Sequence, residues 1–334
     1  MKVLVLFDLP RPVDRETTFS MRELREEEER PTEADVITAL RKLGHDVDAR
    51  AVYDDALAVV ETVRDRSPDV VFNLCESFFN DRVHEPNIPA LLELLRVPYT
   101  GAGPDSLLLC KDKQLAKTLL SYHRIRVPRS VVSRKRAPRR SLRGFCFPAF
   151  VKPLGQESSE GIAKASFGRN EKDTIERTRF LHSSLGCDVM IEEYIEGREL
   201  YVSVLGNRGV TVLPTRELFF GDMPETEPRF ATVRAKWDGD YRAKWGIRNG
   251  AAAPLPAPVE KRMPAFARQV YTLLKIKGTG RLDLRLTPGG ELVFIEANPN
   301  PSLARGDDFA RSAAAAGLDY ETLIQRILDL ARTH

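Results

Sequence analysis

Short apolar runs that alternate with helix-like segments constrain the fold of this chain more than any other feature of its sequence. Residues 3–7 and 70–74 are almost entirely apolar, which is typical of strands that are buried on both faces. Between them, the apolar residues of segment 36–43 recur at helical spacing, and Gly44 follows where a glycine commonly ends a helix. Another helix is expected at residues 88–95. This alternation predicts a parallel α/β sheet.

The size and charge of the chain exclude several classes of protein. Its 334 residues suffice for about two domains at ~150 residues each. The net charge of +3 is too small to indicate nucleic-acid binding by itself. No apolar run approaches the ~18 residues that cross a bilayer, and Asp8 interrupts the first apolar run before it could act as a secretion signal. We therefore expect a cytoplasmic protein without nucleic-acid or membrane partners.

The cysteines do not indicate a metal cage or a disulfide framework. Cys75, Cys110, Cys146 and Cys187 lie far apart and form no CxxC pair. We expect four reduced thiols, as is usual for a protein of the cytoplasm.

Three segments depart from the alternation of strands and helices. Segment 11–30 is dense in charge, and it is either a solvated helix or loop or a flap that faces a ligand at the end of the first strand. Segment 134–140 is basic without aromatic residues, which favours a solvated linker over a nucleic-acid site. Segment 206–257 has few periodic apolar positions, and a loop of that length is usually functional.

Further elements are expected downstream of residue 111. Asp112 can cap a helix that runs to about residue 123. Turn residues at 288–290 predict a hairpin between two neighbouring strands. The expected strands are 148–152, a return strand at 162–166, 189–194, 199–205, 280–286 and 292–297, and a helix is expected over residues 320–331.

The strongest chemical signal lies in the predicted hairpin. Arg281 and Asp283 are two residues apart, as are Glu296 and Asn298, so each pair points to one face of its strand. Carboxylates between apolar flanks are costly unless a cation compensates them. Carboxylate and amide oxygens suit Mg²⁺. The alternative is a plain ion pair between Arg281 and Asp283 on a solvated strand face.

Two weaker signals precede the hairpin. Lys152 ends a strand and is followed by the polar turn 155–161, a combination that can hold a phosphate but that also occurs in ordinary exposed turns. Segment 191–200 reads Ile-Glu-Glu-Tyr-Ile-Glu-Gly-Arg-Glu-Leu. Its backbone can pair with an adenine edge and a carboxylate can bind ribose, whereas the alternative is an edge strand with a hairpin turn.

In their order along the chain, these motifs resemble the ATP-grasp superfamily and, within it, proteins like D-alanine–D-alanine ligase. The ordered set runs from Asp112-Lys113 through Val151-Lys152-Pro153, 191–200 and Ala235-Lys236-Trp237 to the hairpin motifs. The resemblance implies an α/β chain with a Rossmann-like pre-ATP-grasp sheet at residues 1–110. A two-subdomain ATP-grasp fold of the α+β type would follow, with a central subdomain at 111–195 and a catalytic C-terminal subdomain at 196–334.

The resemblance also assigns roles to single residues of this chain. The ATP phosphates would be bound by Lys113 and Lys152, with Ser158 and Ser159 in the loop over them. The adenine amino group would bind Glu192, and the base would lie beside Glu193, Tyr194 and Ile195. The ribose would bind Glu199. Asp283, Glu296 and Asn298 would be the Mg²⁺ ligands, and Mn²⁺ could replace the Mg²⁺. Arg281, Lys236 and Ser158 would act on the transferred phosphoryl group.

Several positions depart from the family pattern. The serine and glutamate that hold the first D-alanine are not found after Asp8, Glu157 stands for a glycine, and Trp237 stands for a tyrosine. Where the family binds the carboxylate of the second substrate, this chain has Asp307 and Asp308. These aspartates would repel a carboxylate and favour a cationic acceptor, unless Arg305 neutralises one of them or they cap the next helix.

The implied activity is an ATP-dependent carboxylate–amine ligase that acts through an acyl phosphate, with segment 206–257 as a lid. Its partners would be a small-molecule carboxylate and an amine, with a substrate other than D-alanine expected, and the chain could form a homodimer. Three alternatives stay open: an authentic D-alanine–D-alanine ligase, a small-molecule kinase, and a nucleotide sensor without catalysis.

Overall fold

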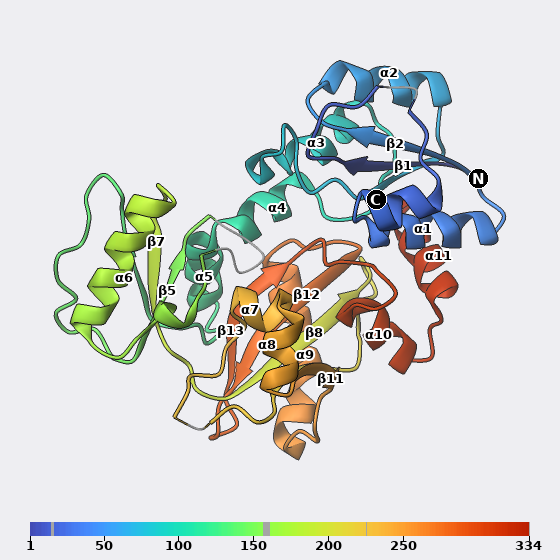
Figure 1. Cartoon of the computed structure of the whole chain (residues 1–334). Coiled ribbons are helices and arrows are strands. Elements are labelled where there is room, and N and C mark those ends of the chain that lie inside the picture. Colours follow the sequence, from blue (N-terminus) through green and yellow to red (C-terminus); the bar gives the residue numbers. More distant parts are fainter. Residues whose placement is uncertain (15–16, 156–160, 225, 334) are drawn as a thin grey trace.

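The computed structural model describes residues 1–14, 17–155, 161–224 and 226–333. In these residues the main strands form three sheets, which we call the first, second and third sheet in chain order. Figure 1 shows the first sheet at the upper right, the second sheet with its covering helix at the left, and the third sheet between them. The α/β fold class with a parallel first sheet, which the sequence predicts, is confirmed.

The first sheet is parallel, as the alternation predicts. Strand β1 (Lys2–Asp8) lies between β2 (Asp46–Val52) and β3 (Val70–Asn73). Because successive side chains of a strand point to opposite faces, one face of β1 packs against α1 (Pro31–Lys42) and the other against α2 (Ala56–Arg66) and α3 (Asn87–Leu94). Both faces are therefore covered, which explains the apolar runs.

The charged segment 11–30 combines features of its two predicted forms, a solvated helix or loop and a flap that faces a ligand. It contains η1 (Glu23–Glu27), a single π-helical turn. Leu24 is fully buried in the core that the first sheet shares with its helices, a unit that we call the first domain. Phe19 meets Phe7 edge-on with ring centroids 5.9 Å apart, while Arg22 and Glu26 form an exposed ion pair of 2.8 Å. The described part of the segment is thus a solvated strap that several apolar side chains anchor to the core.

The second sheet is antiparallel and has one covering helix. Its strand order is β4-β7-β5-β6, with β4 (Ser130–Ser133), β5 (Ala149–Pro153), β6 (Phe167–Gly168), β7 (Val189–Glu193) and α6 (Glu171–Ser184). The basic segment 134–140 is an exposed linker between β4 and β5, and Arg134 pairs with Asp188 at 2.8 Å.

The expected return strand at residues 162–166 is wrong. Residues Lys164–Ser166 form the 3₁₀ turn η3 instead. Its chain closes on itself, because the Ser166 N–H donates to the Ala163 carbonyl at 2.8 Å and the Ala163 N–H donates to Ser166 Oγ at 3.2 Å. A serine that bonds the nearby backbone competes with strand pairing, so the strand begins only at Phe167.

Two helices lead from the first domain to the second sheet. They are α4 (Pro104–Lys111) and α5 (Lys113–Tyr122). The predicted cap is present, since the Asp112 carboxylate accepts hydrogen bonds from the N–H groups of Gln114 at 3.1 Å and Leu115 at 2.9 Å.

The third sheet carries the predicted hairpin at one edge. Its order is β11-β10-β8-β12-β13, with β9 paired to β8. The strands are β8 (Arg198–Leu205), β9 (Thr211–Val212), β10 (Arg216–Phe220), β11 (Ile247–Ala251), β12 (Thr279–Leu286) and β13 (Leu292–Asn298), and α9 (Ala257–Leu273) packs on one face.

The expectation of one long loop at 206–257 is wrong. This segment contributes β9, β10 and β11 to the third sheet, together with the short helices α7 (Val233–Trp237) and α8 (Gly239–Lys244). Thr232 and Asp238 cap the two helices, accepting N–H bonds of 3.0 Å and 2.8 Å. The elements have only two to six residues, too few for periodicity to show in the sequence.

The last two helices of the described chain join the first domain. They are α10 (Asp308–Ala315) and α11 (Tyr320–Ala331), the latter as predicted. The apolar face of α11, which includes Leu323 and Leu328, shares a core with α1 and β1, and Figure 1 shows α11 beside α1. The predicted domain boundaries stay predictions, but residues 308–331 pack with the first sheet.

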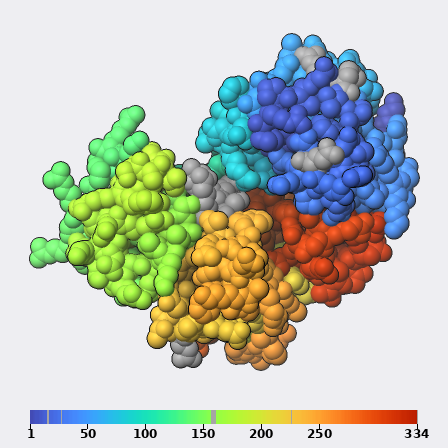
Figure 2. All heavy atoms as spheres, in the orientation of Figure 1, coloured from blue at the N-terminus to red at the C-terminus, as the bar shows by residue number. Residues whose placement is uncertain are grey.

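The surface of the molecule is deeply notched. The space-filling view shows the notch between the lobe of the second sheet (green) and the first domain (blue), above the orange atoms of α7 and α8 (Figure 2). All four cysteines are free thiols. None of the helices in the described ranges combines the length and the apolarity that a bilayer crossing needs.

Candidate functional site

The polar face of the β12–β13 hairpin is the centre of the candidate site. Arg281 lies opposite Asn298, and Asp283 lies opposite Glu296, so the four side chains share one face as predicted. The guanidinium of Arg281 binds the Asp283 carboxylate through two hydrogen bonds of 2.8 Å and 3.0 Å. The ion pair of the alternative interpretation therefore exists, but on a largely buried face and not a solvated one.

The two carboxylates of this face, Asp283 and Glu296, differ in how strongly their surroundings favour the ionised form. Burial raises the pKa of Asp283, with Arg281 opposing. Burial acts in the same direction on Glu296, but the lysines Lys113, Lys152, Lys236 and Lys117 around it lower its pKa to about 2. Glu296 is therefore a carboxylate at neutral pH, in a field of cations that come from α5, β5 and α7.

Glu192 lies between two buried lysines. Its carboxylate binds Lys152 Nζ at 2.9 Å and also binds Lys117, and all three side chains are 3% exposed. Burial favours the neutral acid, yet the two lysines lower the pKa of Glu192 below its usual value. Burial lowers the pKa of Lys117, against the opposing charge of Glu192. Lys152 and Glu192 thus bind each other directly, a contact that the separate roles in the family comparison did not predict.

Lys117 is a functional candidate that the sequence reasoning missed. It lies one helical turn after Lys113 on α5, a spacing that places both lysines on the same side of the helix. Both side chains are buried, which is rare for lysine. The four-residue spacing between Lys113 and Lys117 is the sequence signal from which Lys117 could have been found.

The end of β7 leads from the second sheet into the third. β7 and β8 belong to different sheets, so the alternative of a simple hairpin at 191–200 is excluded. Glu193 points away from Glu192, because its carboxylate accepts the N–H of Arg129 at 3.1 Å and binds Arg126. The connection after β7 includes Ile195, which is half-buried.

Aromatic rings surround Tyr194 at this connection. Tyr194 meets Phe167 edge-on at 4.9 Å, and Phe150 meets Phe230 at the same centroid distance. The Tyr194 hydroxyl donates to the Arg229 carbonyl at 3.1 Å. Flat apolar surfaces of this kind are typical of sites that bind a ring.

Glu199 is anchored at the start of β8. Its carboxylate accepts hydrogen bonds from Arg285 at 2.8 Å and from the Tyr201 hydroxyl at 2.9 Å. Ser158 and Ser159, the predicted phosphate-loop serines, lie outside the described residues.

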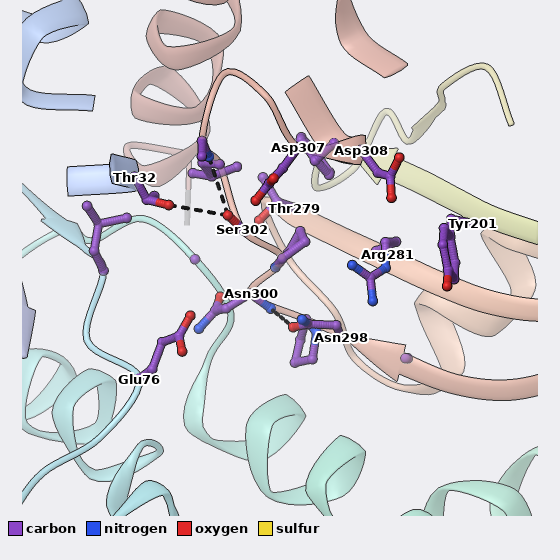
Figure 3. Close-up of a pocket in the computed structure, with 18 of the residues that line it drawn as sticks. Thr32, Glu76, Tyr201, Thr279, Arg281, Asn298, Asn300, Ser302, Asp307 and Asp308 are labelled. Carbon is purple, nitrogen blue, oxygen red and sulfur yellow. Dashed lines mark hydrogen bonds between the residues drawn. The ribbon is translucent and has the colours of Figure 1, made fainter. Parts of the chain in front are cut away.

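A large cavity joins the hairpin to the first domain. It has a volume of about 1290 Å³, and five of the predicted residues line it: Lys113, Lys236, Arg281, Glu296 and Asn298. Figure 3 shows Arg281 and Asn298 on one side, Glu76 and Thr32 on the first-domain side, and Asp307 and Asp308 above the hairpin. The adenine-side residues Glu192–Glu199 are not part of this lining; they lie at the junction of the second and third sheets.

The two aspartates at the start of α10 have different environments. Asp308 binds Arg216 and Asn249 at 2.6 Å each. Asp307 is exposed and does not cap α10 with its side chain. Arg305 pairs with Glu321 instead, at 2.6 Å. Both alternative explanations of the aspartates, a helix cap and neutralisation by Arg305, are therefore wrong, and Arg216 is the counter-ion of Asp308.

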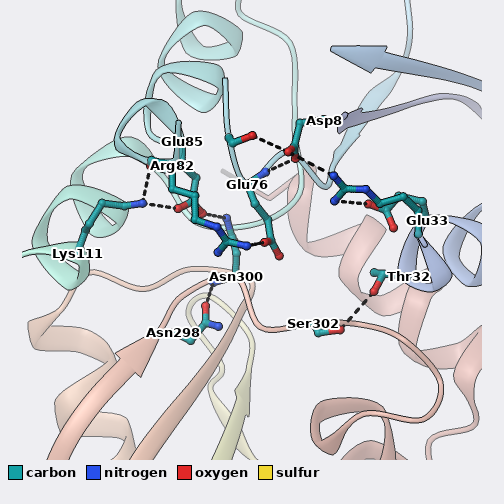
Figure 4. Close-up of polar contacts among 12 residues, drawn as sticks. Asp8, Thr32, Glu33, Glu76, Arg82, Glu85, Lys111, Asn298, Asn300 and Ser302 are labelled. Atoms are coloured by element: carbon teal, nitrogen blue, oxygen red, sulfur yellow. Dashed lines mark hydrogen bonds and ion pairs between the residues drawn. The ribbon is translucent and has the colours of Figure 1, made fainter. Parts of the chain in front are cut away.

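The first-domain wall of the cavity holds four carboxylates, which the sequence did not reveal: those of Glu29, Glu33, Glu76 and Glu85. Asp8 accepts hydrogen bonds from the Glu76 N–H at 2.7 Å and the Ser77 hydroxyl at 2.6 Å. Arg30 lies 3.7 Å from the carboxylates of both Asp8 and Glu33 (Figure 4). Burial raises the pKa of Glu33 to about 7, partly offset by Arg30. Glu29 and Arg30, the end of segment 11–30, also line the cavity, so part of that segment faces the site.

The donor set of the hairpin fits a hard divalent cation. Asp283 and Glu296 are directly opposed across the two strands, and a cation between them would relieve the repulsion that helps to raise the pKa of Asp283. The Asn298 oxygen completes a set of oxygen donors of the kind that Mg²⁺ takes. Within the described ranges, no cluster of three or more His, Cys, Asp or Glu side chains is arranged for a metal, so a cation at the hairpin would need the Asn298 amide as its third ligand.

Comparisons with known proteins show which family this chain resembles over most of its length. The family described as D-ala D-ala ligase C-terminus matches residues 112–329. The D-alanine–D-alanine ligase of Gluconobacter oxydans is 30% identical over 86% of this chain and 88% of its own length. The uncharacterized protein y4sG of Sinorhizobium fredii is 29% identical over 89% of this chain and 86% of its own.

A solved structure reproduces the whole arrangement of elements. The D-alanine–D-alanine ligase of Bacillus anthracis, crystallised with ATP, superposes with a TM-score of 0.74 at 20% identity, covering 100% of this chain and 98% of that one. At this identity the likeness concerns the fold.

Proposed function

The chain belongs to the D-alanine–D-alanine ligase family of the ATP-grasp ligases, and on this premise we propose that its cleft joins a small carboxylate to an amine at the expense of ATP. One observation carries the proposal: Glu296, on the hairpin face that also holds Arg281 and Asp283, is near enough to four lysines for their charges to lower its pKa, namely Lys113, Lys152, Lys236 and Lys117. Such a field of fixed cations suits a reaction that transfers a charged phosphoryl group.

The proposed reaction has two steps. A carboxylate oxygen of the donor attacks the γ-phosphorus of ATP, and the bond to the β,γ-bridging oxygen breaks. The products of this step are ADP and the acyl phosphate of the donor. A neutral amine then attacks the acyl carbon, and the tetrahedral intermediate expels phosphate and loses a proton to give the amide. Arg281, which lines the cavity, is placed to bind the transferred phosphoryl group and the oxyanion, with Lys236 and Lys113 at the phosphates.

Asp283, Glu296 and Asn298 would hold Mg²⁺ against the ATP phosphates. Bound there, the ion would neutralise charge on the transferred group. The same oxygen ligands accept Mn²⁺. The adenine would lie at the β7–β8 junction beside Tyr194 and Ile195, with Glu199 at the ribose.

The acceptor is proposed not to be D-alanine. A second D-alanine brings a carboxylate to the N-terminal end of α10, where the exposed Asp307 would repel it by roughly 1 kcal/mol at 4 Å in water. Because Arg216 neutralises Asp308, the discrimination rests on Asp307 alone and is weaker than two free aspartates would give. An acceptor with a cationic group near Asp307 is favoured.

A second candidate, authentic D-alanine–D-alanine ligation, is favoured by the extent of the match to the Gluconobacter oxydans ligase, which spans most of both chains. The two candidates share the ATP chemistry and differ only in the substrates.

A substrate panel separates the candidates. D- and L-amino acids and simple amines are supplied in pairs with Mg²⁺·ATP, and both phosphate release and product mass are measured. Efficient release with D-alanine alone, with D-alanyl-D-alanine as product, would overturn the substrate proposal. A phosphorylated product without any amine requirement would replace the ligase by a kinase.

A further inference from the structure

Among the contacts that fasten the loop after β13 to the first domain, those of one asparagine lie next to the hairpin. Asn300 lies two residues after Asn298 and lines the cavity. Its Oδ1 accepts the N–H of Ala102 at 2.8 Å, and its Nδ2 donates to Glu85 Oε1 at 3.5 Å. Its own backbone N–H donates to Asn298 Oδ1 at 3.0 Å. Figure 4 shows Asn300 between Asn298 and the first-domain residues Glu85 and Lys111.

We propose that Asn300 is a positioning residue for phosphoryl transfer, which uses the first domain as an anchor to orient the side-chain oxygen of Asn298. The inference rests on the proposed function, in which Asn298 is a ligand of the ATP-bound metal. Asn300 itself touches neither ATP nor the metal.

The hydrogen bond to Asn298 fixes a choice of rotamer. An asparagine side chain ends in an amide with an oxygen on one side and an NH₂ group on the other. One accepted N–H bond decides where the oxygen points. The oxygen retains a second lone pair for a cation. Partners of this kind, which hold a ligand without touching the metal, commonly contribute 10–100-fold to metal affinity.

The anchor in the first domain is closely fitted. Gly101 has a φ of +92°, and a Cβ at this position would lie 2.8 Å from Asn300 Oδ1, so any larger residue would push the asparagine away. Glu85 is itself fixed, since Lys111 Nζ binds its Oε2 at 3.0 Å and the Arg82 carbonyl at 2.6 Å. An amide is required at position 300, because it must accept from Ala102 and donate to Glu85 at the same time.

Other contacts keep the loop in place without Asn300. Thr32 and Ser302 form a hydroxyl–hydroxyl bond of 3.2 Å, and the Arg305 N–H donates to Asp35 at 3.0 Å. Removing the amide of Asn300 should therefore leave the rest of the loop docked, but the backbone at residue 300, whose N–H orients Asn298, is then free to shift.

The test compares Asn300→Leu with Asn207→Leu. Asn207 is a matched control, because its amide also bridges two segments, accepting from Gly278 N–H at 2.9 Å and donating to the Leu330 carbonyl at 3.0 Å, but it does not line the cavity. The readout is the Mg²⁺ concentration at which a non-hydrolysable ATP analogue reaches half-maximal binding, measured by calorimetry, together with the unfolding midpoint of each variant.

We expect Asn300→Leu to raise the half-maximal Mg²⁺ concentration by about 10-fold, whereas Asn207→Leu leaves it within twofold of wild type. The apparent KM for Mg²⁺ should rise in parallel, with little change in the KM of the amine. An unchanged Mg²⁺ requirement in Asn300→Leu, with loss of unfolding stability only, would overturn the inference.

Two further arms keep the result interpretable. Asn300→Asp preserves the shape and the bond from Ala102 but faces Glu85 with a charge, so it should show the same change if Asn300→Leu does not fold. Wild-type protein that binds the analogue equally with and without Mg²⁺ would refute the proposed metal site, whereas a Mg²⁺-dependent wild type with a normal Asn300→Asp and Asn300→Leu would refute only the role of Asn300.

Discussion

At the scale of single residues, the site concentrates charge that water would ordinarily screen. Lys117, Lys152 and Glu192 are almost fully buried together, and a lone charge in such a place costs several kcal/mol. Because burial lowers the pKa of Lys117, its positive charge is the less secure of the two, and an anion bound nearby would favour its charged form. Family resemblance named Lys152 and Glu192 from the sequence but not their direct contact, because no sequence spacing links α5, β5 and β7.

We predict that Glu296→Gln lowers turnover by at least ~10²-fold, which is the order of loss when a preorganised group at a reacting centre is removed. The substitution keeps the shape of the side chain and removes the charge that four lysines stabilise. Steady-state phosphate release at saturating Mg²⁺·ATP measures the effect. Near-normal turnover would contradict the assignment of Glu296 to the metal site.

We predict that Glu33 makes the protein less stable as pH rises from about 5 to 8. The native pKa is about 7 and the unfolded value is ~4.3, so between these values the native state holds more protons. The free energy of unfolding then falls with pH, by about 4 kcal/mol in total at 1.36 kcal/mol per unit. Below pH 4 the contribution is fully present.

Glu33→Gln cannot titrate and should lose this part of the pH dependence. Urea unfolding of wild type and variant at pH 5 and pH 8 measures the difference, and the variant should gain on the wild type at pH 8. Glu26→Gln, at an exposed position of the strap that precedes α1, is the control and should follow the wild type. Parallel curves for Glu33→Gln and wild type would show that burial does not hold the proton.

At the scale of elements, the sequence predicted those whose periodicity is long or whose burial is two-sided. β1, β3, α5, the β12–β13 hairpin and α11 fall where apolar runs, a capping aspartate or a turn place them. β2 was not predicted, because its Asp-Val-Asp-Ala-Arg-Ala-Val sequence alternates charge with small residues. The elements within 206–257 are individually too short for periodicity to reveal them.

The lid stays a prediction at this scale. Lys236 lies on α7 and lines the cavity, and the neighbouring Trp237 is 71% exposed. We predict that limited trypsin digestion cuts within 206–257 in the free protein and that Mg²⁺ with a non-hydrolysable ATP analogue suppresses the cut. Mass spectrometry of the fragments locates it. A cleavage rate that nucleotide leaves unchanged would show that the segment does not close.

At the scale of the whole molecule, the cleft brings together residues far apart in the sequence, such as Thr32 and Ser302, which are 270 positions apart. No local pattern in the sequence connects them. The family resemblance supplied the fold and the roles on the hairpin, but not the acidic wall around Asp8 and Glu33, which arises only when α1 and the loop after β3 meet.

The packing of α11 on α1 leads to a prediction about stability. Leu328 is fully buried in the core that α11 shares with the first sheet, so Leu328→Ala should cost about 2–5 kcal/mol. Hydrogen exchange should speed up in β1 and β3 as well as in α11. Leu94→Ala, at an exposed position of the first domain, should change stability by less than about 0.5 kcal/mol. Faster exchange confined to α11 would mean that the shared core is not cooperative.

That shared core also limits how such a protein can recombine. The helix that covers one side of the first sheet is encoded some three hundred residues after β1, so a crossover at the end of the first domain separates two halves of one core. A chimaera that takes residues 1–110 from a relative would pair a foreign α1 with the native α11. Exchanges that carry both ends of the gene together, and leave the middle untouched, preserve the interface and are the ones expected to yield folded enzymes.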